Sequence, residues 1–233
     1  AEGLVAGGGD LSTARLLAAY RSGILPWFNE SPILWWSPDP RAIIDPEHLH
    51  VSRSLWRTLR KCGWSVRATS ELGAVLEGCA EREEGTWITE EMFDAYVELG
   101  RRGHALAYEV RDGDELVGGL YGVLTDGLFA AESKFHRARD ASKVALVVSV
   151  LHAFARGVQL FDVQFKTDHL ASLGVREVTR DEYLARLEHA LVVTDSAGGA
   201  AAPAAAGNPP GEGVDLLAWS LEKWAERSAH GDS

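Results

Sequence analysis

The sequence predicts an α+β protein, in which a small N-terminal domain precedes a larger domain built on one sheet. Three observations lead to this prediction. The first 64 residues combine two short amphipathic helix patterns with extended chain that is broken by prolines. Three closely spaced strand patterns then precede a strongly apolar helix and another strand, an order that favours one mixed sheet. Past residue 193 the chain turns to alanine, glycine and proline, a composition typical of a flexible linker.

These changes of pattern divide the chain into four parts. We expect a small N-terminal domain at residues 1–64 and a larger domain at 65–193. An Ala/Gly/Pro linker at 194–213 then leads to a C-terminal helix at 214–233, which can dock on the body or on a partner.

The first domain has two predicted helices. Ser12 or Asp10 can cap the first, and Gly23 ends it. The second runs from Ser52 to Lys61 and stops before Gly63.

Between these helices, the chain is kept extended by Pro26, Pro32, Pro38 and Pro40, and this stretch holds the adjacent Trp35 and Trp36. Large aromatic residues usually serve burial. We therefore expect the pair to pack the small domain against the large one. Arg41, which follows, is expected to hold the same loop or a phosphate.

The larger domain contains a predicted meander, in which the turns at 111–114 and 125–127 join three strands as hairpins. This meander, followed by a helix and a strand, has the layout of the GNAT acyltransferase fold. In order, the predicted elements are a strand at 64–69, a helix at 70–81 capped by Ser70, a helix at 89–103 capped by Thr89, strands at 104–110, 115–124 and 127–135, a helix at 141–157, a strand at 158–165 and a helix at 179–191 capped by Thr179.

The connection between the last meander strand and its helix departs from that layout. GNAT enzymes bind the pyrophosphate of acetyl-CoA with a glycine-rich loop at this place. Residues 136–143 read HRARDASK and contain no glycine. We therefore expect the acyl group to arrive on a carrier other than CoA.

Composition narrows the function classes. The net charge of −11 argues against a general nucleic-acid binder, because phosphate contacts need a positive face. Two cysteines cannot build a disulfide framework, which favours a reduced, cytoplasmic protein. The longest apolar run, Val144 to Phe154, is shorter than the ~17 residues that a membrane helix needs. No cluster with metal-ligand spacing stands out.

A local basic segment runs against the overall charge. Between Arg41 and Ser70 there are six basic residues and two acidic ones. Such a patch can hold one segment of nucleic acid, or it can be a solvated face without a partner.

The strand at 158–165 carries the first candidate site. Because alternate residues share a face, Asp162 and Gln164 should point the same way as Val158 and Leu160. A carboxylate and an amide on an otherwise apolar strand are costly unless they are satisfied or used. They can brace neighbouring loops, or Asp162 can orient Gln164 or accept a proton itself.

Glu132 is the second candidate, in a strand between Phe129 and Phe135. A buried glutamate could bind a cation or an amine, or it could pair with Lys134 on the same face. Phe129 and Glu132 lie on opposite faces of a regular strand. If both serve one pocket, a bulge or a strand end must intervene.

Many stretches together resemble the leucyl/phenylalanyl-tRNA–protein transferase family, in the family's order and near its spacing, from about Gly8 to Leu187. The matching stretches are GGDLSTARLLAAYRSGILPWF, PILWWSPDPRAII, HVSRS, EGCAEREEGTWIT, DELVGGLYGV, LFAAESKF, ASKVAL, LFDVQ and DHLASLGVREVTRDEYLARL.

The resemblance implies a small N-terminal domain, a GNAT-like catalytic domain and a defined reaction. Such enzymes take leucine, phenylalanine or sometimes methionine from aminoacyl-tRNA. They join it to the α-amino group of a protein that begins with lysine or arginine, which marks that protein for N-degron degradation. We expect a cytoplasmic monomer without a cofactor, a metal or a membrane contact.

The resemblance also implies roles for residues. Trp27 matches the tryptophan that packs on the terminal adenosine of the tRNA, and Asp162 and Gln164 match the catalytic pair. Glu132 matches the glutamate that engages the acceptor amine. The pocket for the donor side chain would be lined by Trp87, Leu120 and Phe129, and the tRNA body would be held by Arg53, Arg57, Arg60 and Lys61.

Four positions depart from the family pattern. Ala131 replaces glycine, Lys134 replaces methionine, Leu25 replaces phenylalanine and Leu120 often corresponds to methionine. Lys134 could neutralise Glu132, which leaves a small-molecule amine as an alternative acceptor. A non-enzymatic tRNA- or protein-binding module is a further alternative, and the intact Asp162-x-Gln164 pair speaks against it.

Overall fold

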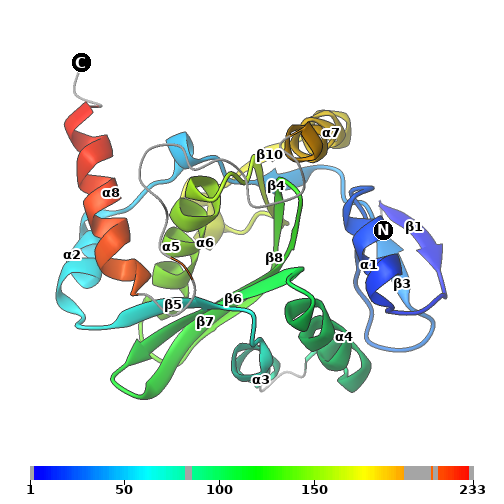
Figure 1. The fold of residues 1–233 in the computed structure, drawn as a ribbon, viewed down its shortest axis with the longest axis horizontal. Coiled ribbons are helices and arrows are strands. Elements are labelled where there is room, and N and C mark those ends of the chain that lie inside the picture. Colours follow the sequence, from blue (N-terminus) through cyan, green and yellow to red (C-terminus); the bar gives the residue numbers. More distant parts are fainter. Residues whose placement is uncertain (1–2, 82–85, 197–210, 212–214, 231–233) are drawn as a thin grey trace.

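The computed structural model describes residues 3–81, 86–196, 211 and 215–230 (Figure 1). Its centre is a seven-stranded sheet with the order β10-β4-β9-β8-β7-β6-β5. A three-stranded sheet, β1-β3-β2, lies to one side with α1. The strands are β1 Leu4–Gly7, β2 Leu25–Pro26, β3 Leu34–Trp36, β4 Arg41–Ile43, β5 Ser65–Thr69, β6 Ala105–Asp112, β7 Glu115–Thr125, β8 Leu128–His136, β9 Leu160–Gln164 and β10 Arg176–Val178.

Helices cover both faces of the large sheet. One core cluster joins the sheet to α2, α5 and α8, and another joins its opposite face to α1, α3, α4 and α7. The helices are α1 Thr13–Tyr20, the 3-10 helix η1 Pro46–His48, α2 Arg53–Lys61, α3 Gly73–Ala80, α4 Glu90–Arg101, α5 Ala141–Ala155, α6 Asp168–Ala171, α7 Arg180–Ser196 and α8 Leu216–His230. Within the described residues, none of these helices is long and apolar enough to cross a bilayer.

The GNAT-like layout is confirmed. Strands β6, β7 and β8 form an antiparallel meander, and β9 returns parallel to β8 after α5. Helix α5 is buried along most of its length, which explains its apolar sequence. The parallel return of β9 places Asp162 opposite Ala130 of β8.

Two of the predicted caps are confirmed and one is wrong. Thr89 and Thr179 accept hydrogen bonds from the backbone N–H groups of Met92 and Glu182, as N-caps should. Helix α3, however, begins at Gly73 after Leu72, and Ser70 does not cap it. The carbonyl oxygen of Ser70 lies against α4, only 2.3 Å from where a Cβ at Gly100 would stand.

The two sheets divide the chain earlier than the sequence suggests. Strand β3 is the last strand along the chain that belongs to the small sheet, and the next strand, β4, belongs to the large one. Helix α2 also packs on α5. Folding of residues 1–64 as one unit therefore stays a prediction, and most of the proposed linker lies outside the described residues.

Candidate functional site

Asp162 lies in the middle of the large sheet and is fully buried. Arg41, on the neighbouring strand β4, donates from Nε and Nη2 to its two carboxylate oxygens at 3.0 and 2.6 Å. The hydroxyl of Tyr183 on α7 donates to Oδ2 at 2.9 Å, and the backbone N–H of Gln164 donates to Oδ1 at 2.8 Å. Burial, followed by the charge of Asp162, raises the pKa of Tyr183 well above its usual value, so this hydroxyl stays a donor.

This arrangement bears on the two roles that the sequence leaves open for Asp162. Both carboxylate oxygens accept hydrogen bonds from fixed protein donors, and the side chain has no exposed surface. A proton could reach Asp162 only if these donors were displaced. The geometry therefore favours orientation of Gln164 over direct proton transfer.

Arg41 is 1% exposed, so it cannot reach a phosphate of a ligand at the surface. The alternative expectation, that Arg41 holds the nearby loop, agrees with the hydrogen bond from its Nη1 to the carbonyl oxygen of Gly23 at 3.1 Å.

Gln164 ends β9 in a left-handed conformation, with φ of 63°. Non-glycine residues adopt this region rarely, and such positions cluster at functional sites. Its Nε2 donates to Oε1 of Glu132 at 2.7 Å, which leaves the amide oxygen as its remaining acceptor. The sequence predicts that Asp162 and Gln164 point the same way. Because the backbone of Gln164 is left-handed, its side chain turns away from that of Asp162 and lines a cavity that Asp162 does not line.

Glu132 occupies a bulge in β8. Its neighbours pair regularly, Ala131 with Gly122 and Ser133 with Tyr121, so Glu132 is the extra residue between them. A bulge, which the sequence made the condition for Phe129 and Glu132 to serve one pocket, is thus present at Glu132. The hydroxyl of Tyr96 donates to Oε2 of Glu132 at 3.1 Å and shares a 2.6 Å hydrogen bond with the hydroxyl of Tyr20.

A small cavity of about 60 Å³ lies where these side chains meet. Glu132 and Gln164 line it together with Leu120, one of the three predicted pocket residues. Phe129 is fully buried behind it, 4.9 Å from the ring of Phe161. Trp87 packs against the core on the other face of the sheet. The structure therefore joins Leu120 to the polar residues and leaves Phe129 and Trp87 apart. The full lining is Leu120, Ala131, Glu132, Ser133, Lys134, Leu146, Val163, Gln164 and Leu170.

Burial raises the pKa of Glu132 to about 7, against the opposing effect of the Tyr20 and Tyr96 hydroxyls. A carboxyl group with this pKa changes charge near neutral pH, as a general base for an amine would need.

The raised pKa predicts a pH dependence of stability. Between about pH 4.5 and about pH 7 the folded protein holds the Glu132 proton and the unfolded chain does not. Stability due to this group should therefore fall as pH rises through that window. The difference in free energy of unfolding between wild type and Glu132→Gln, measured from pH 4 to 8, should show this fall. Parallel curves for the two proteins would contradict the prediction.

Trp27 lies beside this centre with 46% of its surface exposed. Its ring packs at 5.3 Å from that of Phe165, the residue after Gln164, and at 6.0 Å from that of Trp36. The indole of Trp36 also donates to the carbonyl oxygen of Trp27. An exposed ring held in this way suits stacking on a base. Trp35 is instead buried, with its indole bonded to Gly8.

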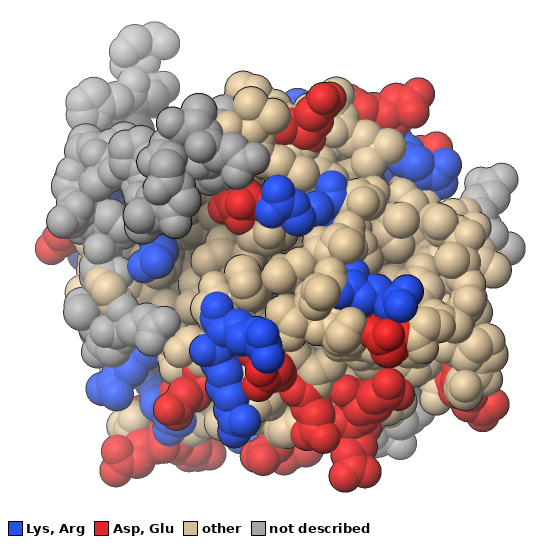
Figure 2. Space-filling model, turned by 45° about the vertical axis from the view of Figure 1, so that its right-hand side comes forward, with Lys and Arg blue, Asp and Glu red and all other residues tan. Residues whose placement is uncertain are grey.

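The four predicted tRNA-binding cations all lie on α2 and are exposed: Arg53, Arg57, Arg60 and Lys61. None of them forms an ion pair with the acids that the structure describes. In the view of Figure 2, acidic side chains gather along the lower edge and basic ones lie nearer the middle. The negative net charge is thus unevenly spread, and α2 is locally positive.

Several site residues escaped the sequence analysis. Tyr20, Tyr96 and Tyr183 read as ordinary residues of amphipathic helices, and Phe165 as the end of an apolar strand. Their signal lies in contacts between segments far apart in the chain.

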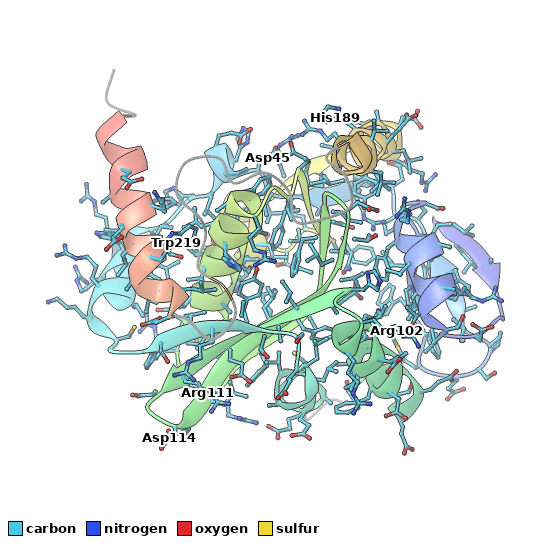
Figure 3. The ribbon with its side chains drawn as sticks, in the orientation of Figure 1. Asp45, Arg102, Arg111, Asp114, His189 and Trp219 are labelled. Atoms are coloured by element: carbon cyan, nitrogen blue, oxygen red, sulfur yellow. The ribbon has the colours of Figure 1, made fainter. Side chains whose placement is uncertain are left out.

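Asp45, Glu47 and His48 have the spacing of metal ligands, which the sequence analysis did not single out (Asp45 is labelled in Figure 3). The Asp45 carboxylate is already engaged by Arg176 at 2.6 Å.

This chain resembles known proteins over most of its length. Residues 43–188 match the leucyl/phenylalanyl-tRNA protein transferase family, and residues 9–39 match its N-terminal domain. The chain is 54% identical to the leucyl/phenylalanyl-tRNA–protein transferase of Anaeromyxobacter sp. (strain K), over 82% of this chain and 84% of that one. It is 52% identical to the enzyme of the same name from Pseudomonas fluorescens (strain Pf0-1), over 79% and 84%.

Among solved structures, L-PGS from Bacillus licheniformis aligns with a TM-score of 0.39 and 12% identity, over 69% of this chain and 55% of that one. Such a slight resemblance says nothing about function. The family matches include strands of both sheets, and the identity to the two relatives establishes common descent. The chain therefore belongs to the leucyl/phenylalanyl-tRNA protein transferase family of enzymes.

Proposed function

We propose that this protein transfers leucine or phenylalanine, and in some cases methionine, from aminoacyl-tRNA to the α-amino group of an acceptor protein. The observation that carries the proposal is the chain of hydrogen bonds from Arg41 through Asp162 and Gln164 to Glu132, which ends at a cavity shared with Leu120. It places an amide, a carboxylate and an apolar wall around one small space.

The chemistry needs little more than juxtaposition. The amine nitrogen attacks the ester carbonyl, a C–N bond forms, and the bond to the ribose oxygen breaks. The proton lost by the amine ends on that oxygen. An ester is activated relative to an amide, so placing the two groups together supplies most of the acceleration. Glu132 can accept the proton from the attacking amine before it reaches the ribose oxygen, because the pKa of Glu132, about 7, lies near that of an α-amine.

Asp162 serves in this proposal as a positioning residue. It holds the backbone N–H of Gln164 and is itself held by Arg41 and Tyr183. The amide oxygen of Gln164 can then accept a hydrogen bond from the attacking amine. Leu120 limits the size of the donor side chain, and apolar walls discriminate by only ~1–3 kcal/mol per methylene. Selection between leucine and phenylalanine should accordingly be modest.

We further propose that the acceptor begins with lysine or arginine, that the product enters N-degron degradation and that the reaction takes place in the cytoplasm. Ionised Glu132 would attract such a basic end. The test is a transfer assay with leucyl- and phenylalanyl-tRNA and peptides that differ only in the first residue. Product with Lys- and Arg-peptides but not with Ala- or Glu-peptides is expected. Absence of product, with tRNA still bound, would sink the acceptor assignment.

A second candidate is transfer to a small-molecule amine. Lys134 lines the same cavity as Glu132 and brings a positive charge where a basic acceptor end would lie. If Lys134 excludes basic ends, Lys134→Met should create a preference for Lys- and Arg-peptides that the wild type lacks. A wild type that already prefers such peptides rules this candidate out.

The tRNA body should bind along α2, where the cations are free to meet phosphates. Arg57→Glu is expected to raise the KM for charged tRNA about tenfold at ~0.1 M salt and to lower the salt slope by about one. The KM for the acceptor peptide should not change. Arg102→Glu at the C-cap of α4, where Arg102 is also exposed, is the matched control. Equal effects of the two variants would contradict a specific α2 contact.

A further inference from the structure

Helix α8 is a separate addition to the part of the chain that the family match covers. That match ends at residue 188, whereas α8 runs from Leu216 to His230. The helix lies beside α2 and α5 (Figure 1). Leu216 and Leu217 are buried in the core, and the ring of Trp219 packs 6.1 Å from that of His152 on α5 (Figure 3).

The start of α8 is fixed by a polar contact. Oδ1 of Asp215 accepts hydrogen bonds from the backbone N–H of Val66 on β5 and from that of Leu217, both at 3.0 Å. One carboxylate thus joins the first turn of α8 to the sheet. The placement of α8 is therefore specified by both polar and apolar contacts.

Helix α2 depends on this neighbour. It has nine residues, and helices this short are marginal without tertiary support. Leu55 and Leu59 are its buried residues. Trp56 gains its cover from α8, where the ring of Trp224 lies at 6.4 Å. Leu221 and Trp224 of α8 share a small apolar cavity with Trp56 and Leu59. One side of α2 is thus supported by α8.

The contact leaves the basic face of α2 uncovered. Arg53, Arg57, Arg60 and Lys61 stay exposed with α8 in place. The one ion pair that α8 forms in the described part of the chain is internal, between Lys223 and Glu226. A helix that masked α2 would put its acids on those cations, so α8 supports α2 without blocking it.

We propose that α8 is a brace that holds α2 at the position and angle needed to dock the tRNA body. Trp224, Leu221 and Trp56 are then positioning residues for tRNA, although they do not touch it. This inference rests on the proposed function. Loss of the brace should weaken use of whole tRNA and spare the chemistry, because the catalytic residues lie on β8 and β9, away from the α2–α8 contact.

The test compares two donors in the full-length protein, phenylalanyl-tRNA and the phenylalanyl ester of adenosine, which is too small to reach α2. For Trp224→Ala we expect the KM for phenylalanyl-tRNA to rise about tenfold at ~0.15 M salt. The kcat with either donor and the KM for the adenosine ester should stay within twofold of wild type. Trp56→Ala should behave alike, and Trp224→Phe should restore most of the affinity.

Two further measurements keep the outcomes separate. Thermal unfolding of each variant shows that the assays are run on folded protein. Direct binding of charged tRNA reports on α2 even if no transfer is seen. No transfer by the wild type from either donor would refute the proposed function, and the binding measurement would still decide on the brace. Wild-type tRNA affinity in Trp224→Ala, or an equal loss with both donors, would overturn the brace.

A substitution at Ser220 should strengthen the contact between α8 and α2 that Trp224→Ala weakens. It is 4% exposed, and its hydroxyl has no hydrogen-bond partner within the described residues. It lines the small cavity, of about 10 Å³, between α8 and α2. Removing a buried hydroxyl without a partner is stabilising or neutral. Ser220→Ala should therefore keep or improve tRNA affinity, and a tenfold loss would count against the brace.

Discussion

Asp162→Asn should lower the free energy of unfolding by about 3–5 kcal/mol. The substitution keeps the shape of the side chain and removes its charge. Arg41, which is 1% exposed, is then left as a buried cation without its counter-ion. Urea unfolding at pH 7 measures the effect. A loss below about 1 kcal/mol, the range of exposed pairs, would contradict it.

Two controls separate this effect from a general one. Glu98→Gln removes the charge of the exposed partner of Arg102 and should cost no more than ~0.5 kcal/mol. The double variant Arg41→Met, Asp162→Leu removes both buried charges and should be more stable than Asp162→Asn. It should nevertheless have no transferase activity, because the support of Gln164 is gone. Stability and catalysis would thus be separated at one site.

Gln164→Glu should lower turnover at least ~10²-fold without weakening tRNA binding. The new carboxylate would face Glu132 at the place where Nε2 now donates at 2.7 Å. Two carboxylates so close share one proton, and the variant has no amide that donates to Glu132 while its oxygen accepts from the amine. Single-turnover transfer, with the enzyme in excess so that all of the charged tRNA is bound, measures the chemical step directly.

The matched control is Gln159→Glu on the same segment, where the amide is exposed and donates to the Gly157 carbonyl oxygen. It should keep wild-type turnover. Gln164→Ala then distinguishes the two roles of Asp162. If Asp162 were itself the base, this variant would retain most of its turnover, and if Asp162 positions Gln164, it would not.

Much of the fold could be predicted because its central elements carry local signals. The meander shows apolar strands joined by glycine-containing turns, and α5 is apolar on every side. Strands β1, β4 and β10 have only three or four residues and show no period of their own. They exist because distant segments offer them backbone partners, and such pairing leaves no trace in a short stretch of sequence.

Some residues of the site could likewise be predicted from the sequence, and others could not. Asp162, Gln164 and Glu132 stand out as polar residues on apolar strands, and the family motifs point to them as well. Arg41 precedes Asp162 by 121 residues, and nothing in its own neighbourhood predicts a buried ion pair. The left-handed backbone of Gln164 was equally hidden, because strand periodicity assumes regular dihedral angles.

The hydrogen bond between Asp215 and Val66 bears on strand pairing between copies of the molecule. Strand β5 ends the large sheet, and an end strand offers outward N–H groups to any extended chain nearby. The carboxylate of Asp215 accepts a hydrogen bond from one of these N–H groups, and its negative charge disfavours the approach of a strand from another sheet. Helix α8 packs along the same strand. Asp215 and α8 thereby disfavour strand-to-strand association at the β5 edge of the large sheet.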